Sequence, residues 1–341
     1  MDDLSPKERL HRTLAKKSVD RRPVICPGGM MNAAVVEVQE NSGRRLPAAH
    51  ANADLMADLA KEVSLDTGFE NYGIPFCMTV EPEVLGSEID LGTVACEPKI
   101  TREIYPDAAS VVFRNESDML KSGRIAVVSE AVAKLAASDS DVPVIGSVTG
   151  PVSTAASIVD PMTFLKDLRK RPQDSHKVMD YVTNFLSAYA GALIDSGAEI
   201  ISISDPTATG EILGPKMFET YALPYINRLA DYIRGRGVKV ILHICGEMRA
   251  VRSHIPAFRA DAISTDAMVN LKNLKADYPD ITTMGNLSTY LLEFGESDKV
   301  AARTEALLNA GIDIIAPACG LSTASSLKNL RAFTGTVKEK V

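Results

Sequence analysis

The sequence predicts a single (β/α)8 barrel over residues 1–341, and three observations support this fold class. Eight short runs of β-branched and aliphatic residues alternate with longer segments of helical periodicity. A length of 341 residues, 45% of them hydrophobic, suits one barrel core. No Gly-x-Gly-x-x-Gly pattern follows an early run, which disfavours a doubly wound dinucleotide-binding fold.

Local signals define the expected elements in order. The first is an amphipathic helix with Ser5 as N-cap and Pro6 at its first position, which would cover the end of the barrel opposite its mouth. Residues 175–197 and 214–237 combine helically spaced apolar residues with terminal glycines. The eight strands are expected at 23–27, 63–69, 142–148, 199–205, 238–244, 261–266, 281–285 and 313–318.

One stretch, residues 72–141, is too long for an ordinary connection between the second and third strands. It contains "PFCMTVEPEVLGSEIDLG" and "ACEPKITREIYPD", in which short extended runs alternate with Pro and Gly turns. We therefore expect an insertion that carries a hairpin over the barrel mouth, rather than a separate domain.

Composition and charge exclude several classes of partner. The net charge is -7 and the Lys and Arg residues are scattered, so no nucleic-acid partner is expected. The first residues alternate in charge, and no run approaches the ~20 apolar residues that cross a bilayer, so no membrane association is expected. The 5 cysteines, an odd number at irregular spacing, argue against a secreted disulfide framework. A cytoplasmic protein is expected.

Three potential metal ligands fall at strand ends. His243 and Cys245 end the fifth expected strand, and their spacing on an extended chain points both side chains to one side. Cys319 ends the eighth strand, and strand ends of one barrel meet at its mouth. Such a His-Cys-Cys set suits zinc and leaves one coordination position for water or substrate, as in catalytic sites. The other cysteines are expected to be packing residues: Cys26, Cys77 and Cys96.

The pattern His-x-Cys, 73 intervening residues and Cys resembles the zinc motif of the methylcobamide:coenzyme M methyltransferases, a branch of the uroporphyrinogen decarboxylase superfamily. The resemblance extends in order over "FCMTVEPEVLG", "SVTGP", "SISDPTATGEILGPKMF", "ILHICG", "MGNL" and "APACGL". It implies a barrel enzyme that takes a methyl group from a methylated corrinoid on a partner corrinoid protein. It also implies Zn²⁺ that binds and deprotonates a small acceptor thiol such as coenzyme M.

Other residues at the mouth have candidate roles beside plainer ones. Asp205 could anchor the corrinoid or the thiol, or cap the next turn. Asn286 could hydrogen-bond the substrate, or satisfy its own loop. Glu81 could supply a displaceable fourth zinc ligand, although a solvated glutamate is the usual case. Asp266 could support His243 from behind.

Two alternative functions remain beside methyl transfer. Uroporphyrinogen decarboxylation would need several arginines in the first βα loop to bind a polycarboxylate, and residues 23–35 contain none. That loop carries Gly28, Gly29 and Met30, which better suit an apolar corrinoid face or a close backbone approach. The second alternative, a non-catalytic corrinoid or tetrapyrrole-binding protein, would have no need of an open metal position.

Overall fold

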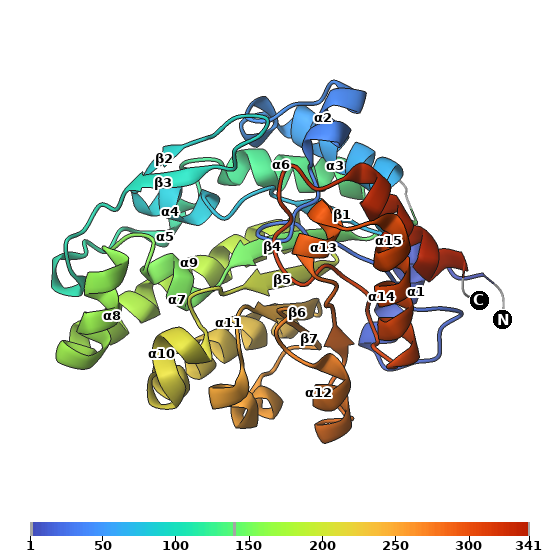
Figure 1. Ribbon diagram of the computed structural model, residues 1–341. Coiled ribbons are helices and arrows are strands. Elements are labelled where there is room, and N and C mark those ends of the chain that lie inside the picture. Colours follow the sequence, from blue (N-terminus) through green and yellow to red (C-terminus); the bar gives the residue numbers. More distant parts are fainter. Residues whose placement is uncertain (1–2, 139–140, 340–341) are drawn as a thin grey trace.

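The computed structural model describes residues 3–138 and 141–339, and it has the predicted (β/α)8 barrel fold, with a central parallel sheet surrounded by helices (Figure 1). Six strands pair in the order β1-β4-β5-β6-β7-β8, every pair parallel. They are β1 (Tyr72–Ile74), β4 (Val144–Thr149), β5 (Ile200–Ser204), β6 (Lys239–Ile244), β7 (Ala262–Thr265) and β8 (Thr283–Met284).

Two extended segments continue the ring beyond these six strands. Ile314 forms a parallel bridge with Met284 of β8, and Ile315 forms one with Val24. These bridges lie in the first and last predicted strands, 23–27 and 313–318. The predicted positions are therefore extended, although each pairs through isolated bridges rather than through a full ladder.

The wall between the first extended segment and β1 is closed by one backbone hydrogen bond and by the side chain of Asn71. The Glu70 N–H donates to the Val24 carbonyl at 2.9 Å. The carboxamide of Asn71 accepts a hydrogen bond from the Cys26 N–H and donates one to the Cys26 carbonyl, both at 2.8 Å. One side chain thus replaces two bonds of a backbone ladder.

The second predicted strand, 63–69, is wrong. Its first five residues are the last of helix α3 (Ala53–Thr67), which ends at Gly68 with a φ of 80°. The buried positions of this helix, among them Met56, Leu59, Ala60 and Val63, have helical spacing, and that spacing outweighs the strand preference of Val63. The true strand, β1, has only three residues and one is a glycine, so it carries almost no strand signal.

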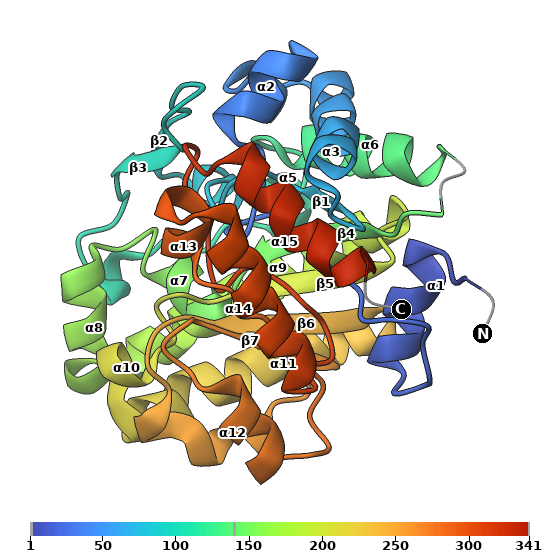
Figure 2. The ribbon, with the colours of Figure 1, turned by 45° about the vertical axis from the view of Figure 1, so that its right-hand side comes forward.

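The remaining helices cover the sheet (Figures 1 and 2), and α14 packs along α15. Within the described ranges, none of the helices combines the length and apolar character needed to cross a membrane. The helices are α1 (Pro6–Leu14), α2 (Val36–Ser42), α4 (Val80–Leu85), α5 (Glu116–Met119), α6 (Ile125–Ala136), α7 (Pro151–Ala155), α8 (Pro161–Lys170), α9 (Pro172–Asp195), α10 (Gly210–Met217), α11 (Leu223–Gly235), α12 (Leu271–Asp277), α13 (Thr289–Phe294), α14 (Ser297–Asn309) and α15 (Leu327–Glu339).

The stretch 72–141 contains the antiparallel pair β2 (Glu88–Asp90) and β3 (Lys99–Arg102), which lies beside α4 (Figure 1). Its first three residues form β1, and α6 near its end packs against α3 and α9 in the outer helix layer. The irregular part of the connection is therefore shorter than the predicted insertion. Residues 139 and 140 lie outside the described residues.

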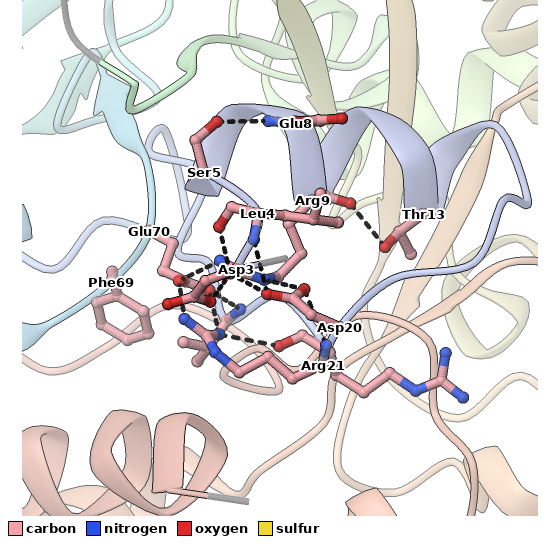
Figure 3. A network of polar contacts seen from close by, with 12 residues as sticks. Asp3, Leu4, Ser5, Glu8, Arg9, Thr13, Asp20, Arg21, Phe69 and Glu70 are labelled. Carbon is pink, nitrogen blue, oxygen red and sulfur yellow. Dashed lines mark hydrogen bonds and ion pairs between the residues drawn. The ribbon is translucent and has the colours of Figure 1, made fainter. Parts of the chain in front are cut away.

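Ser5 is the N-cap of helix α1, as predicted, and its side chain accepts a hydrogen bond from the Glu8 N–H. A buried ion-pair network ties this helix to the barrel (Figure 3). The Arg9 guanidinium bonds Asp20 at 2.6 Å and Glu70, just before β1, at 2.9 Å. Because the Arg9 hydrogen bond stabilises the ionised form, it lowers the pKa of Asp20.

Candidate metal centre

His243, Cys245 and Cys319 meet at the carboxyl end of the strands, as the sequence predicted. His243 is the fifth residue of β6, and its Nε2 lies 3.1 Å from the Cys245 Sγ. The Cys245 Sγ lies 3.3 Å from the Cys319 Sγ, and the three ligand atoms all lie within 4.8 Å of one another. The imidazole is fully buried, whereas both thiols are partly exposed. The cluster is therefore accessible to solvent on the side of its two sulfur atoms.

Strand register orients the imidazole. His243 pairs with Ser204 of β5 and Ser264 of β7, and residues in register on parallel strands point the same way. The Ser264 Oγ lies 2.9 Å from the His243 Nδ1, which leaves Nε2 facing the thiols. Asp266, predicted for this supporting role, instead accepts the Met268 N–H at 3.0 Å. The residue that supports His243 is Ser264.

Ser264→Ala should reduce zinc affinity about 10- to 100-fold, because loss of a supporting hydrogen bond frees the imidazole to rotate. Competition with a chromophoric chelator measures this affinity. Ser202→Ala is the matched control, since Ser202 is a buried serine of β5 whose hydroxyl has no partner among the described residues. Equal zinc affinities for the two variants would remove Ser264 from the centre.

The two thiol sulfur atoms lie within hydrogen-bond distance of each other. The hydrogen bond with Cys245 lowers the pKa of Cys319 to about 5, since it stabilises the thiolate. The same hydrogen bond, together with burial, raises the pKa of Cys245. A bound divalent cation would favour the thiolate form of both cysteines.

These residues fit zinc. Sulfur and nitrogen ligands of a tetrahedral zinc lie about 3.5 to 3.8 Å apart, given metal–ligand distances of roughly 2.0 to 2.3 Å. The observed 3.1 and 3.3 Å separations become suitable if the three side chains spread slightly. The donor set is soft, and the hydrogen bond between Nδ1 and the Ser264 hydroxyl is compatible with the imidazole tautomer that a metal requires at Nε2.

The loop with Gly28, Gly29 and Met30 lies directly beside the cluster. Gly28 has a φ of +94°, and a Cβ there would lie 2.5 Å from the carbonyl carbon of Gly73 in β1. A Cβ on Gly29 would lie 2.8 Å from the Cβ of Ser147 in β4. The glycines are thus required for the loop to enter the barrel. The Met30 Sδ then lies 3.9 Å from the Cys245 Sγ.

Asp205 and Asn286 both have structural partners. Asp205 is fully buried, and its carboxylate accepts hydrogen bonds from the Val152 N–H at 3.0 Å and the Ser153 N–H at 2.8 Å, at the start of α7. The Asn286 amide donates to the carbonyls of Asp266 and Val269 at 2.7 and 2.8 Å. Their predicted contacts with substrate or corrinoid stay predictions.

Glu81 lies on α4 and is buried. Its Oε1 accepts the Thr149 N–H at 2.6 Å, and its Oε2 has no partner among the described residues. Burial raises its pKa to about 7. The potential ligand group among the described residues consists of the histidine and the two cysteines and does not contain Glu81. Its predicted role as a displaceable ligand stays a prediction.

The raised pKa of Glu81 predicts a stability change with pH. The folded state holds the proton more tightly than the unfolded chain, so its stabilisation is complete below pH 4.5 and is lost as the pH rises to about 7. Glu81→Gln should remove this loss. The difference in free energy of unfolding between the variant and wild type should change by about 3 kcal/mol in favour of the variant as the pH rises from 4.5 to 8. Urea denaturation at each pH measures this difference. Glu40 is exposed, so Glu40→Gln should show the same pH dependence of the free energy of unfolding as wild type. If Glu81→Gln also showed the pH dependence of wild type, the prediction would be wrong.

A cavity of about 670 Å³ opens beside Cys319. Met30 lines it together with Glu97 from the segment between β2 and β3 and with Tyr290 of α13. The connection between β1 and β4 therefore reaches the mouth. The fold and the cluster together define a class of protein: a (β/α)8 barrel with soft metal-ligand side chains at the strand ends, where such barrels carry active sites.

Comparison with known proteins identifies the family. The profile of the uroporphyrinogen decarboxylase (URO-D) family matches residues 5–340. The methylcobamide:CoM methyltransferase MtbA of Methanosarcina acetivorans is 32% identical, and MtaA of Methanosarcina barkeri is 31% identical, each over 99% of both chains. The chain belongs to the uroporphyrinogen decarboxylase family, in its methylcobamide:CoM methyltransferase branch. It is accordingly a methyltransferase, as predicted.

Solved structures agree with this assignment. The structure of a methyltransferase from Methanosarcina mazei matches with a TM-score of 0.91 and 30% identity, covering 98% of this chain and 99% of that one. A B12-independent methionine synthase from Shewanella shares 14% identity at a TM-score of 0.57, which shows similarity of fold alone.

Proposed function

We propose that this enzyme moves a methyl group from a methylated corrinoid, carried by a partner corrinoid protein, to a small thiol such as coenzyme M. His243, Cys245 and Cys319 would hold Zn²⁺. The observation that carries the proposal is the convergence of these three ligand atoms within 4.8 Å at the barrel mouth. The relatives named for methylcobamide and CoM supply the donor and acceptor classes.

Each part of the centre has a role in this reaction. Bound zinc would deprotonate the acceptor thiol and keep it as a nucleophilic thiolate. The protein ligands, one neutral imidazole and two thiolates, leave the bound acceptor electron-rich. The acceptor sulfur would form a bond to the methyl carbon as the bond from that carbon to the corrinoid breaks, and the corrinoid, as the donor substrate, would keep the electron pair. The thiol proton leaves to solvent, and the product is a methyl thioether.

The surrounding residues would orient the two substrates. Ser264 fixes the imidazole of His243. The loops of Gly28, Gly29, Met30 and Asn286 would face the corrinoid, and Asp205 would hold the start of α7 near the reacting groups. The protein's contribution would thus be activation of the acceptor thiol together with positioning of the two substrates. We infer that the reaction takes place in the cytoplasm, where thiols stay reduced.

The test combines metal content with a transfer assay. Elemental mass spectrometry of untagged protein is expected to give about one zinc per chain, in line with a three-ligand catalytic site. Incubation with methylcobalamin and coenzyme M is expected to yield the methyl thioether, detected by mass spectrometry. A protein that binds no zinc when it is supplied under reducing conditions, and forms no thioether, would exclude the proposal. Release of carbon dioxide from uroporphyrinogen would instead support the decarboxylase alternative.

A further inference from the structure

We infer that the groove between α8 and α10 binds an acidic surface of the partner corrinoid protein. This inference rests on the proposed function, which requires such a protein to bring its methylated corrinoid to the barrel mouth. It assigns the partner a docking surface on the rim of the mouth, and it assigns the partner's own contact surface carboxylates and apolar side chains.

Two adjoining cavities form the groove. They measure about 340 and 630 Å³, and four residues of α8 and α10 line both of them: Leu168, Arg169, Leu213 and Met217. The two helices lie side by side in both views of the molecule (Figures 1 and 2). Two large apolar side chains that line the smaller cavity stay exposed, Met162 at 63% and Ile212 at 46%. Exposed apolar side chains gathered at a groove are typical of an interaction site.

The edges of the groove are positively charged, although the chain as a whole has a net charge of -7. Four cations line it, all of them exposed, and none forms an ion pair within the described part of the chain: Lys166, Arg169, Lys170 and Lys216. The carboxylate of α8, Asp167, is buried and accepts the Ala108 N–H at 3.0 Å. Just beyond the helix, Arg171 pairs with Asp107 at 2.6 Å. The unpaired cations therefore fit a partner that supplies carboxylates.

The groove begins beside the metal-ligand cluster. A Cβ on Gly246, the residue after Cys245, would lie 2.9 Å from the Oε2 of Glu211 in the first turn of α10. Lys216 follows on the same helix, and even an extended chain of this length would separate its Cα from that of Glu211 by at most about 18 Å. A small protein domain is about 30 Å across. A partner that places a corrinoid over the cluster is therefore wide enough to reach the groove.

The backbone along the larger cavity is irregular. Helix α10 breaks at Gly214, whose φ of 68° and ψ of 166° are not helical, and Pro215 follows. The next segment, Phe218–Ala222, forms a π-helix that contributes Thr220 and Tyr221 to the wall. π-Helical turns are rare and occur frequently at functional sites. This part of the wall thus has a second feature that points to an interaction.

A comparison of two methyl donors tests the inference. Lys216→Glu should raise the KM for a methylated corrinoid protein about fivefold at low salt and leave kcat unchanged, because charge repulsion slows association with an acidic partner. The protein donor is the corrinoid holoprotein, from the enzyme's source organism, that wild type demethylates. Transfer from free methylcobalamin and the zinc content should stay as in wild type. At 1 M salt, where the Debye length is about 3 Å, the difference in KM should disappear.

Lys17→Glu is the matched control for this substitution. Lys17 is an exposed lysine beside the start of β8, at the end of the barrel opposite the mouth. Its replacement makes the same change in net charge, so a KM equal to that of wild type is expected. Arg169→Glu, on the other wall of the groove, should act in the same direction as Lys216→Glu.

The outcomes separate this inference from the proposed function. Equal KM values for Lys216→Glu and Lys17→Glu overturn the inference and leave the proposed function intact. An equal loss of transfer from free methylcobalamin also overturns it, since the groove would then act on the reaction rather than on docking. A wild-type dimer that Lys216→Glu dissociates in sedimentation overturns it too, because a second copy of this chain would occupy the groove. Failure of wild type to use either donor overturns the proposed function itself.

Discussion

Cys319→Ser is expected to abolish methyl transfer, with a loss of at least about a thousandfold, because the variant lacks one of the three proposed ligands of a metal that would supply several kcal/mol. Bound zinc should fall from one per chain to a small fraction. The assay is thioether formation from methylcobalamin and coenzyme M, measured beside zinc content on the same preparation. Circular dichroism establishes that the variant is folded.

Cys96→Ser is the matched control for this substitution. Cys96 is an exposed cysteine that lines the same cavity as Cys319 but lies outside the ligand group, so its replacement should leave the zinc content unchanged. A Cys319→Ser protein that keeps its zinc and its activity would show that the thiolate mechanism is wrong. Equal losses in both variants would point to general sensitivity of the cysteines rather than to a ligand role.

Arg9→Met is expected to have the largest effect on stability, lowering the free energy of unfolding by about 3–5 kcal/mol. Its side chain is 2% exposed and pairs with the side chains of Asp20 and Glu70, which are 6% and 3% exposed. Removal of the cation leaves buried carboxylates without their main partner, although Glu70 keeps its ion pair with Arg21. Urea denaturation at neutral pH measures the loss.

Arg12→Met in the same helix provides the comparison. Arg12 pairs with Glu8 across one helical turn, and both side chains are well exposed, so the expected loss is only about 0.5 kcal/mol. If the two substitutions had similar effects, the network in Figure 3 would contribute nothing beyond ordinary surface pairing.

Most of the fold could be predicted because long periodic segments dominate the sequence. The error at residues 63–69 arose where strand propensity and helical spacing overlap within one short run. β1 was missed because three residues, one of them Gly73, offer no pattern. The cis peptide bond between Gly285 and Asn286 likewise has no signal in the sequence.

The group of potential metal ligands could be predicted because few side chain types bind zinc and the chain has few of them. The residue that hydrogen-bonds the His243 imidazole could not be predicted, because its identity depends on which residues of β6 and β7 lie in register. Asp266 follows the end of β7 and looked suitable by chemistry alone, whereas Ser264 faces the imidazole directly. Similarly, the place of Glu81 inside the protein depends on how α4 packs, which composition does not reveal.

The two hydrogen bonds between the Asn71 side chain and the backbone of Cys26 join the barrel wall to the loop beside the metal-ligand cluster, and only asparagine can make both of them. Aspartate at this position could not donate to the Cys26 carbonyl, and glutamine would extend too far to make both bonds. The Cys26 thiol also donates a hydrogen bond to the carbonyl of Met31, which lies two residues after Gly29. Local unfolding at this seam would therefore release the loop that carries Met30, so hydrogen exchange at the Cys26 amide would report on the integrity of the metal centre.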